Sequence, residues 1–203
     1  ASKELFEYCG FKKIPMIYAS SAATYGHGES GFNENIAEPA FLQPLNEYAN
    51  SKNDFDQYVP YLEQPPFWAG LKFFNVYGEG ERIKGKMASM VNHGYKQIMK
   101  TGKIQLYKSY INKYADGEQK RDFVYVKDVC NVMYWLMNNH ENTASGIYNV
   151  GTGVATTFND LAKTIFGALE LPERIEYIDM PEQLQATYQN YTCADTVKLQ
   201  SAG

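Results

Sequence analysis

Apolar and polar residues along the chain follow two patterns, which predict short buried strands and amphipathic helices. The strand pattern is a run of about four to eight mostly apolar residues between polar or glycine-containing stretches. It occurs at 14–20, 67–74, 104–107, 123–126, 147–150 and 175–178. Apolar residues recur at helical spacing near 5–10, 47–62, 87–99, 127–138 and 158–169. Strands that alternate with helices predict an α/β fold with a parallel sheet.

Glycine, proline and aspartate mark the expected ends of several elements. We expect Gly10 to stop the first helix, and Pro65 and Pro66 to end the second. Asp128 is the expected N-cap of the helix near 127–138. The polar stretch 109–119 carries no clear period and predicts an exposed loop.

The composition fits a globular protein and excludes several classes of function. Apolar residues make up 44% of the 203 residues and charged residues 21%, so disorder and coiled coil are not expected. No apolar run approaches the roughly 18 residues of a membrane span, and no secretion signal begins the chain, so we expect a cytoplasmic protein without a membrane partner. The formal charge of -4 argues against nucleic acid as a partner.

The cysteines and histidines predict neither a disulfide framework nor a metal site. The three cysteines are odd in number and far apart in the sequence, with no C-x-x-C pair. The three histidines lack the spacings by which a helix presents two ligands to one metal. These residues are Cys9, Cys130 and Cys193, and His27, His93 and His140.

Tyr48 and Lys52 are the first residues that point to a reaction. They lie four positions apart in a predicted helix and therefore share a face. A tyrosine is a weak base near neutral pH, but a nearby ammonium and a cationic nicotinamide would both favour its phenolate. The hydroxyl of Ser21, at the end of a predicted strand, could bond the alcohol or carbonyl that is interconverted. Alone, the Tyr/Lys spacing also fits a packed tyrosine beside a solvated lysine.

The neighbouring segments strengthen the catalytic interpretation. Ser-Ser-Ala-Ala-Thr-Tyr-Gly (20–26) precedes the Tyr/Lys pair, and Phe-Asn-Val-Tyr-Gly (74–78) follows the next predicted strand. In this order, the serine, the Tyr/Lys pair and Asn75 resemble the extended short-chain dehydrogenase/reductase family, which includes nucleotide-sugar epimerases and dehydratases. This resemblance implies a Rossmann-type fold and a lysine, Lys52, that contacts the nicotinamide ribose.

A closer resemblance within that family is to the ADP-glycero-manno-heptose 6-epimerases. It is carried by residues 18–26, Lys84-Gly85 before Met87-Ala88-Ser89, residues 120–126, and Tyr188-Gln189 before 192–195. It implies an ADP-heptose substrate of lipopolysaccharide core synthesis, bound NADP and a homo-oligomer, a homopentamer in the family. Members begin with a strand, a Gly-rich turn and a helix that hold the pyrophosphate, and they continue past the position of Gly203. We therefore expect a fragment that lacks the N-terminal Gly-rich region and the C-terminal end, is inactive alone and binds NADP poorly.

The resemblance also implies two domains. Residues 1–82, to which 122–150 partly return, would be the remainder of an NADP-binding Rossmann domain with a doubly wound parallel sheet. Residues 83–203 would form mainly a smaller α/β substrate-binding domain.

Site roles follow from the same resemblance. The reaction oxidises the substrate at C6'' and reduces it again from the other face, and after the ketone turns over, a second acid/base is useful. Tyr48 and Lys84 would fill these two roles, assisted by Ser21 and Lys52. The implied cofactor contacts are Tyr48, Lys52, Val76 and Lys84, and the implied substrate contacts are Ser21, Asn75, Lys86, His93, Arg121 and Tyr188.

Several of these residues have other interpretations. Lys84 could be a solvated surface charge, Arg121 part of an ordinary ion pair, and His93 a polar residue at a helix surface. Arg121 has the clearest physical case, because a guanidinium can grip a diphosphate with two hydrogen bonds. Two features depart from the family: Lys86 replaces an expected small hydroxyl residue, and the loop 110–119 is longer.

Three other functions remain open. A 4,6-dehydratase would share Tyr48 and Lys52, but that branch normally has an Asp-Glu pair where this chain has Ala22-Ala23. A 4-epimerase lacks the segment around Lys84. A non-catalytic nucleotide-sugar-binding module would keep the fold without the activity.

Overall fold

Three parallel strands form the sheet that carries Ser21 at one edge. A computed structural model describes residues 1–35 and 38–203. Strands β1 (Met16–Ser21), β2 (Trp68–Phe73) and β6 (Gly146–Val150) pair in the order β1-β2-β6. Ser21 is in register with Phe73, and Phe73 with Val150, so the carboxyl ends of all three strands lie at one edge.

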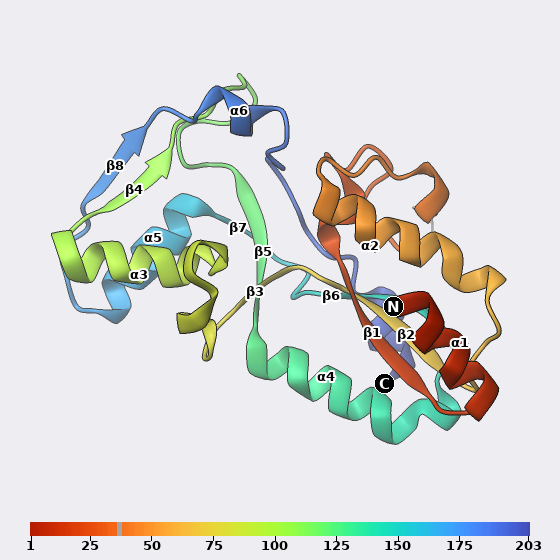
Figure 1. The fold of residues 1–203 in the computed structure, drawn as a ribbon. Coiled ribbons are helices and arrows are strands. Elements are labelled where there is room, and N and C mark those ends of the chain that lie inside the picture. The colour runs from red at the N-terminus through yellow and green to blue at the C-terminus, as the bar shows by residue number, and fades with distance from the viewer. Residues whose placement is uncertain (36–37) are drawn as a thin grey trace.

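Helices cover both faces of this sheet (Figure 1). Helices α1 (Ser2–Lys12) and α2 (Glu47–Tyr58) pack on one face, where Phe6 and Tyr18 are buried together. Helices α4 (Val126–Asn139) and α7 (Val197–Ala202) pack on the other, against a core that includes Leu71 and Tyr148. Successive strand residues point to opposite faces, which is why Tyr18 joins the first core while Ile17 packs against the second.

A second group of elements is built around β5 (Lys120–Tyr125). Strand β3 (Asn75–Tyr77) pairs with β5 in parallel, and β7 (Ala155–Thr157) pairs with it antiparallel. A separate parallel pair joins β4 (Ile104–Tyr107) to β8 (Ile175–Ile178). Helices α3 (Met90–Thr101) and α5 (Phe158–Ala168) enclose a core with β4. The short helices are η1 (Ala22–Tyr25), η2 (Pro39–Phe41), η3 (Val59–Tyr61), η4 (Glu81–Met87), η5 (His140–Asn142) and α6 (Glu182–Gln185).

The predicted α/β class is confirmed, and each predicted strand and helix is present. The strands at 104–107 and 175–178 have the predicted ends, and the ends of the other elements are shifted. The first helix continues past Gly10 to Lys12, and Lys13 takes the left-handed conformation that ends it, at φ 57°. Asp128 is not an N-cap, because α4 already begins at Val126 and Asp128 lies in its first turn. Residues 109–119 contain no helix or strand, but Gly117 and Gln119 are buried, so the loop is only partly exposed.

The described part of the chain contains neither a helix suited to span a membrane nor a cluster of metal-ligating side chains. None of its helices combines the length and apolar character needed to cross a membrane. The same residues hold no group of three or more His, Cys, Asp or Glu side chains arranged for a metal ion.

Candidate active site

Tyr48 and Lys52 lie on the first two turns of α2. Asn46 fixes the start of the helix, because its side-chain oxygen accepts a hydrogen bond from the Ala49 amide at 2.9 Å. The Lys52 ammonium lies 5.8 Å from the Tyr48 ring centroid and donates to the Ala19 carbonyl at 2.9 Å. The Tyr48 side chain is exposed. One helix face therefore presents a phenol and an ammonium next to the end of β1.

Ser21 ends β1 at the edge that α2 approaches. Its hydroxyl oxygen caps η1 by accepting a hydrogen bond from the Ala23 amide at 3.2 Å. Within residues 1–35 and 38–203, no acceptor takes the Ser21 hydroxyl proton, so this proton is free to bind a ligand oxygen. Ligands of open parallel sheets bind beyond the carboxyl ends of the strands, which is where Ser21 lies.

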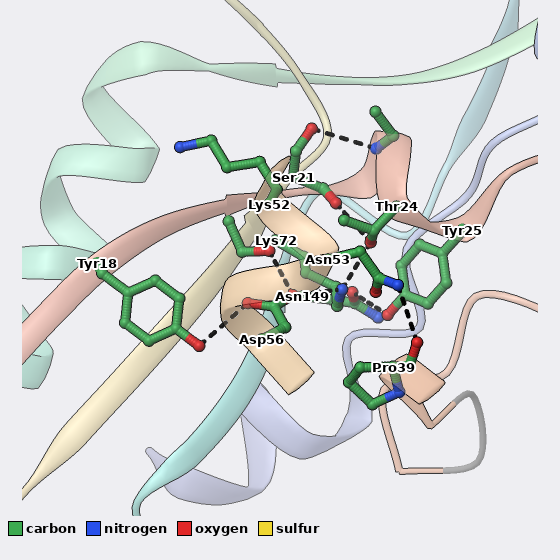
Figure 2. A network of polar contacts seen from close by, with 12 residues as sticks. Tyr18, Ser21, Thr24, Tyr25, Pro39, Lys52, Asn53, Asp56, Lys72 and Asn149 are labelled. Carbon is green, nitrogen blue, oxygen red and sulfur yellow. Dashed lines mark hydrogen bonds and ion pairs between the residues drawn. The ribbon is translucent and has the colours of Figure 1, made fainter. Parts of the chain in front are cut away.

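A buried polar network connects α2 to the strand that carries Ser21 (Figure 2). We call it the Asp56 network; it consists of Ser20, Thr24, Asp56, Lys72 and the Ser21 carbonyl. Asp56 Oδ2 accepts from Ser20 Oγ at 2.6 Å and from Lys72 Nζ at 2.8 Å. Lys72 Nζ also donates to Thr24 Oγ1 at 2.6 Å, and Thr24 Oγ1 donates to the Ser21 carbonyl at 2.8 Å. All four side chains are buried, and desolvation lowers the pKa of Lys72 although Asp56 opposes that shift.

A cavity of about 410 Å³ opens between α3, β4, β5 and the segment before Tyr188. His93, Arg121 and Tyr188 all line it, so the structure brings together three residues that lie far apart in the sequence. The remaining lining residues are Ala88, Met90, Gln97, Gln105, Leu106, Tyr107, Gln119, Phe158 and Ile178. Its wall is therefore aromatic and apolar with a few polar groups, as in small-molecule binding sites.

Arg121 is the buried charge of this cavity. The side chain is 8% exposed, and Nη1 donates to the Lys120 carbonyl at 2.9 Å. The guanidinium carbon lies 4.9 Å from the Tyr188 ring centroid and 5.6 Å from that of Phe158. No carboxylate of residues 1–35 or 38–203 lies within ion-pair distance of it. Burial lowers the pKa of Arg121 from its very high ordinary value, and the site is suited to an anionic ligand.

Glu81 organises the η4 segment that carries Lys84. It is buried, and its carboxylate accepts from the Gly78 amide at 2.9 Å, from Ser89 Oγ at 2.8 Å and from the Ser89 amide. Burial would raise the pKa of Glu81, but these hydrogen bonds and the nearby Lys84 hold it below its ordinary value. Gly85, at φ 54° and ψ −121°, bends the segment directly after Lys84, whose side chain is exposed.

Comparison with known proteins decides the family. The model of the NAD dependent epimerase/dehydratase family matches residues 1–151, about three quarters of the chain. This protein is a member of that family. The match covers the strand end with Ser21, the Tyr48/Lys52 pair and Arg121.

Individual members of the NAD dependent epimerase/dehydratase family match the whole chain. ADP-L-glycero-D-manno-heptose-6-epimerase of Fusobacterium nucleatum is 48% identical and that of Nitratidesulfovibrio vulgaris 46% identical, each over all of this chain. The crystal structure of the Helicobacter pylori protein of that name has a TM-score of 0.78 and 30% identity over 98% of this chain. The chain spans 63%, 62% and 56% of these three proteins, less than two thirds of each.

Six of the residues expected to form the site lie in two groups. Lys52 lies beside Tyr48 and binds the Ala19 carbonyl, two residues before Ser21 at the end of β1. His93, Arg121 and Tyr188 line one cavity. Two more expected residues, Lys86 and Asn75, lie beside the cavity residues. The Lys86 carbonyl lies 3.3 Å from His93 Nε2. Asn75 Nδ2 donates to the Asp122 carbonyl and to Thr192 Oγ1, at 3.2 and 3.4 Å.

Two expected residues touch neither group. Val76 is half-buried in β3, paired with Val124, and packs against the core under α4. In the described chain no hydrogen bond joins Lys84 to Tyr48, and Lys84 remains a predicted catalytic residue.

Asp56 and Lys72 were missed by sequence reasoning, although two signals pointed to them. Lys72 is the one charged residue in an otherwise apolar predicted strand, and a buried lysine needs a partner. Asp56 follows Tyr48 and Lys52 at the same four-residue spacing, so it extends their face of the helix.

Proposed function

We propose that this chain supplies the reactive and substrate-binding residues of an ADP-L-glycero-D-manno-heptose 6-epimerase, which interconverts ADP-D-glycero-D-manno-heptose and ADP-L-glycero-D-manno-heptose. The observation that carries the proposal is the 46–48% identity, over the whole chain, to two proteins of that name. Because the chain spans less than two thirds of those relatives, the activity is proposed for the protein that contains these residues.

Ser21, Tyr48 and Lys52 fit the reacting end of a nicotinamide cofactor. The free hydroxyl proton of Ser21 and the unused donor positions of Lys52 lie at the carboxyl edge of a parallel sheet, where dinucleotides bind. Bound beside Tyr48 and Lys52, such a cofactor would supply the hydride chemistry of the reaction, which is oxidation of the substrate carbon and its reduction from the opposite face. We propose NADP as this cofactor, on the resemblance to the heptose epimerases.

In the first half-reaction Tyr48 removes the proton from the substrate hydroxyl. The Lys52 ammonium lies 5.8 Å from the Tyr48 ring centroid, and Ser21 donates a hydrogen bond to the substrate oxygen as it becomes a carbonyl. In the second half-reaction the ketone presents its other face, and its oxygen no longer points to Tyr48. Lys84 then supplies the proton that converts the reduced oxygen back to a hydroxyl, and proton exchange with solvent returns Tyr48 and Lys84 to their starting states.

The cavity holds the nucleotide diphosphate in this proposal. Arg121 offers a planar fork of donors to the phosphate oxygens, and the Tyr188 ring keeps the guanidinium in place. His93 lines the cavity, and the Lys86 carbonyl lies 3.3 Å from its Nε2. Asn75, bonded to the Asp122 carbonyl next to Arg121, and Val76 of β3 complete the proposed substrate and cofactor contacts.

An NMR assay of C6'' epimerisation tests the function. The protein is expressed from its complete reading frame, supplied with ADP-D-glycero-D-manno-heptose, and followed to the equilibrium mixture of the two epimers without net cofactor turnover. We expect Tyr48→Phe and Lys84→Ala each to lower the rate by at least about 100-fold. Lys103→Ala, which removes an exposed lysine paired with Glu176, is the matched control and leaves the rate unchanged. Unchanged epimerisation in both site variants would refute the proposal.

Three further properties follow from the same resemblance. We propose that residues 1–203 alone bind NADP weakly and are inactive, which calorimetric titration of the isolated chain tests. We also propose a homopentamer in the cytoplasm, which light scattering and cell fractionation test.

A further inference from the structure

We propose that the Asp56 network is a positioning device that holds Ser21 at a fixed place relative to Tyr48 and Lys52. The inference rests on the proposed function, because it assigns a role in that reaction to residues that do not touch substrate. The network forms a closed ring: Asp56 on α2 binds Ser20 and Lys72, Lys72 binds Thr24, and Thr24 binds the Ser21 carbonyl.

Both ends of the ring lie next to the reactive groups. Asp56 is one helical turn beyond Lys52, and Lys52 itself donates to the Ala19 carbonyl, two residues before Ser21. Helix α2 is thus attached to the end of β1 at two successive positions, through the Ala19 carbonyl and the Ser20 hydroxyl. The turn after Ser21 is attached to the same carboxylate through Thr24 and Lys72.

Stability alone does not account for a pair of buried charges here. Asp56 and Lys72 are each 1% exposed, and removing two charges from water costs about as much free energy as their attraction returns. Apolar residues of similar volume would hold α2 on the sheet equally well. The charged groups add a fixed geometry between α2 and the end of β1, because hydrogen bonds fix both distance and angle whereas apolar contacts do not.

The placement of Ser21 relative to Tyr48 matters for the proposed reaction. Ser21 and Tyr48 belong to different elements, yet both must reach the same substrate oxygen. A misplacement of about 1 Å can lower a rate roughly 100-fold. Ser21 also lies at the start of η1. Its hydroxyl oxygen caps this turn by accepting a hydrogen bond from the Ala23 amide, and that bond is 3.2 Å long. The hydrogen bond from Thr24 Oγ1 to the Ser21 carbonyl, at 2.8 Å, is the shorter of the two bonds that hold this turn.

The first test needs no substrate. Thr24→Val removes the hydroxyl that joins Lys72 to Ser21 but leaves the Asp56–Lys72 ion pair intact. We expect hydrogen exchange of the Ala23 and Gly26 amides to speed up at least about 10-fold, whereas Tyr18→Phe, which removes a different hydroxyl from Asp56, leaves it unchanged. Equal exchange in Thr24→Val and wild type overturns the proposal. If Thr24→Val does not fold, Ser20→Ala replaces it, with the same expectation.

The second test is kinetic and uses the protein from its complete reading frame. We expect Thr24→Val to lower kcat about 10-fold, Thr24→Ser to restore it, and Tyr18→Phe to change it less than about 2-fold. In a Ser21→Ala background, Thr24→Val should have no further effect, because its action runs through Ser21. A loss of the same size in both backgrounds would show a merely structural role. If wild type acts on another nucleotide sugar instead, the proposed function fails, and the same cycle on that sugar still decides this inference.

Discussion

Replacing Arg121 with methionine should leave the free protein at least as stable as wild type while removing its affinity for nucleotide diphosphate. Arg121 is 8% exposed, and methionine replaces it with an unbranched side chain of similar volume. The substitution removes the bond to the Lys120 carbonyl and the contacts with the Tyr188 and Phe158 rings. We assign about 2 kcal/mol to the charged hydrogen bond and about 2 kcal/mol to the two rings together.

The burial of the charge opposes these favourable interactions. An ion removed from water costs several kcal/mol, which we take as roughly 5 kcal/mol, and Arg121 has no carboxylate partner in the described chain to offset it. The balance favours methionine by about 1 kcal/mol. For a chain of this length that corresponds to a rise in Tm of about 2–4 °C.

Thermal unfolding with and without 1 mM ADP measures both effects. Without ADP, the Tm of Arg121→Met should equal or exceed that of wild type. With ADP, wild type should be stabilised and Arg121→Met should not, because loss of a charged hydrogen bond of about 1.5–3 kcal/mol weakens binding about 10- to 100-fold. Lys103→Met, at an exposed ion pair, is the control and should respond to ADP like wild type.

Two results would contradict the reasoning. A fall in Tm of more than about 5 °C for Arg121→Met without ligand would mean that the guanidinium stabilises the fold, as a structural ion pair would. Equal stabilisation of Arg121→Met and wild type by ADP would mean that the diphosphate binds elsewhere. Arg121→Lys separates charge from shape, since it keeps the charge but loses the planar fork, and we expect it to bind ADP as weakly as Arg121→Met.

Two other predictions concern buried carboxylates. Asp56→Ala leaves Lys72 buried without its partner and should reduce the free energy of unfolding by about 3–5 kcal/mol in urea denaturation, far more than Lys103→Ala does; equal losses would contradict the assigned burial. The pKa of Glu81 is lower in the folded chain than its ordinary 4.5, so the stability that its ionised form contributes is complete above that pH and is lost as the pH falls through the lowered value. Unfolding measured between pH 3 and 7 should therefore show a steeper acid loss for wild type than for Glu81→Gln, and parallel curves would exclude this role.

Periodicity predicted the elements well because most of them bury one apolar face. The strand 67–74 and the helix 158–169 each have a clear apolar pattern in the sequence, and both are present within two residues of the expected ends. Strands β3 and β7 were not predicted, since each is only three residues long and shows no pattern. The starts of α3 and α4 were misplaced because caps depend on local geometry: Ser89 caps α3 by accepting from the Asn92 amide at 3.2 Å.

The sequence predicted which residues belong to the candidate site better than it predicted which of them are in contact. His93, Arg121 and Tyr188 share one cavity, but only the fold brings residues 95 positions apart together. The Asp56 network could not be read from any motif, because Lys72 and Thr24 meet through β1–β2 pairing and the turn that follows β1. Its traces in the sequence are only the lone charge of Lys72 in an apolar run and the four-residue spacing between Lys52 and Asp56.

Among residues 1–35 and 38–203, Arg121 has no counter-ion although its neighbour in the sequence is an aspartate, and the strand explains why. Successive residues of β5 point to opposite faces, so Asp122 faces away from the cavity that Arg121 lines. Asp122 is fully buried and accepts hydrogen bonds from the amides of Thr152, Gly153 and Ala194 at 2.8 to 3.0 Å. Its charge is thus used to hold the loop after β6, while the charge of Arg121 stays unneutralised inside the cavity. A fold that separates two adjacent opposite charges in this way keeps the positive one available for an anion.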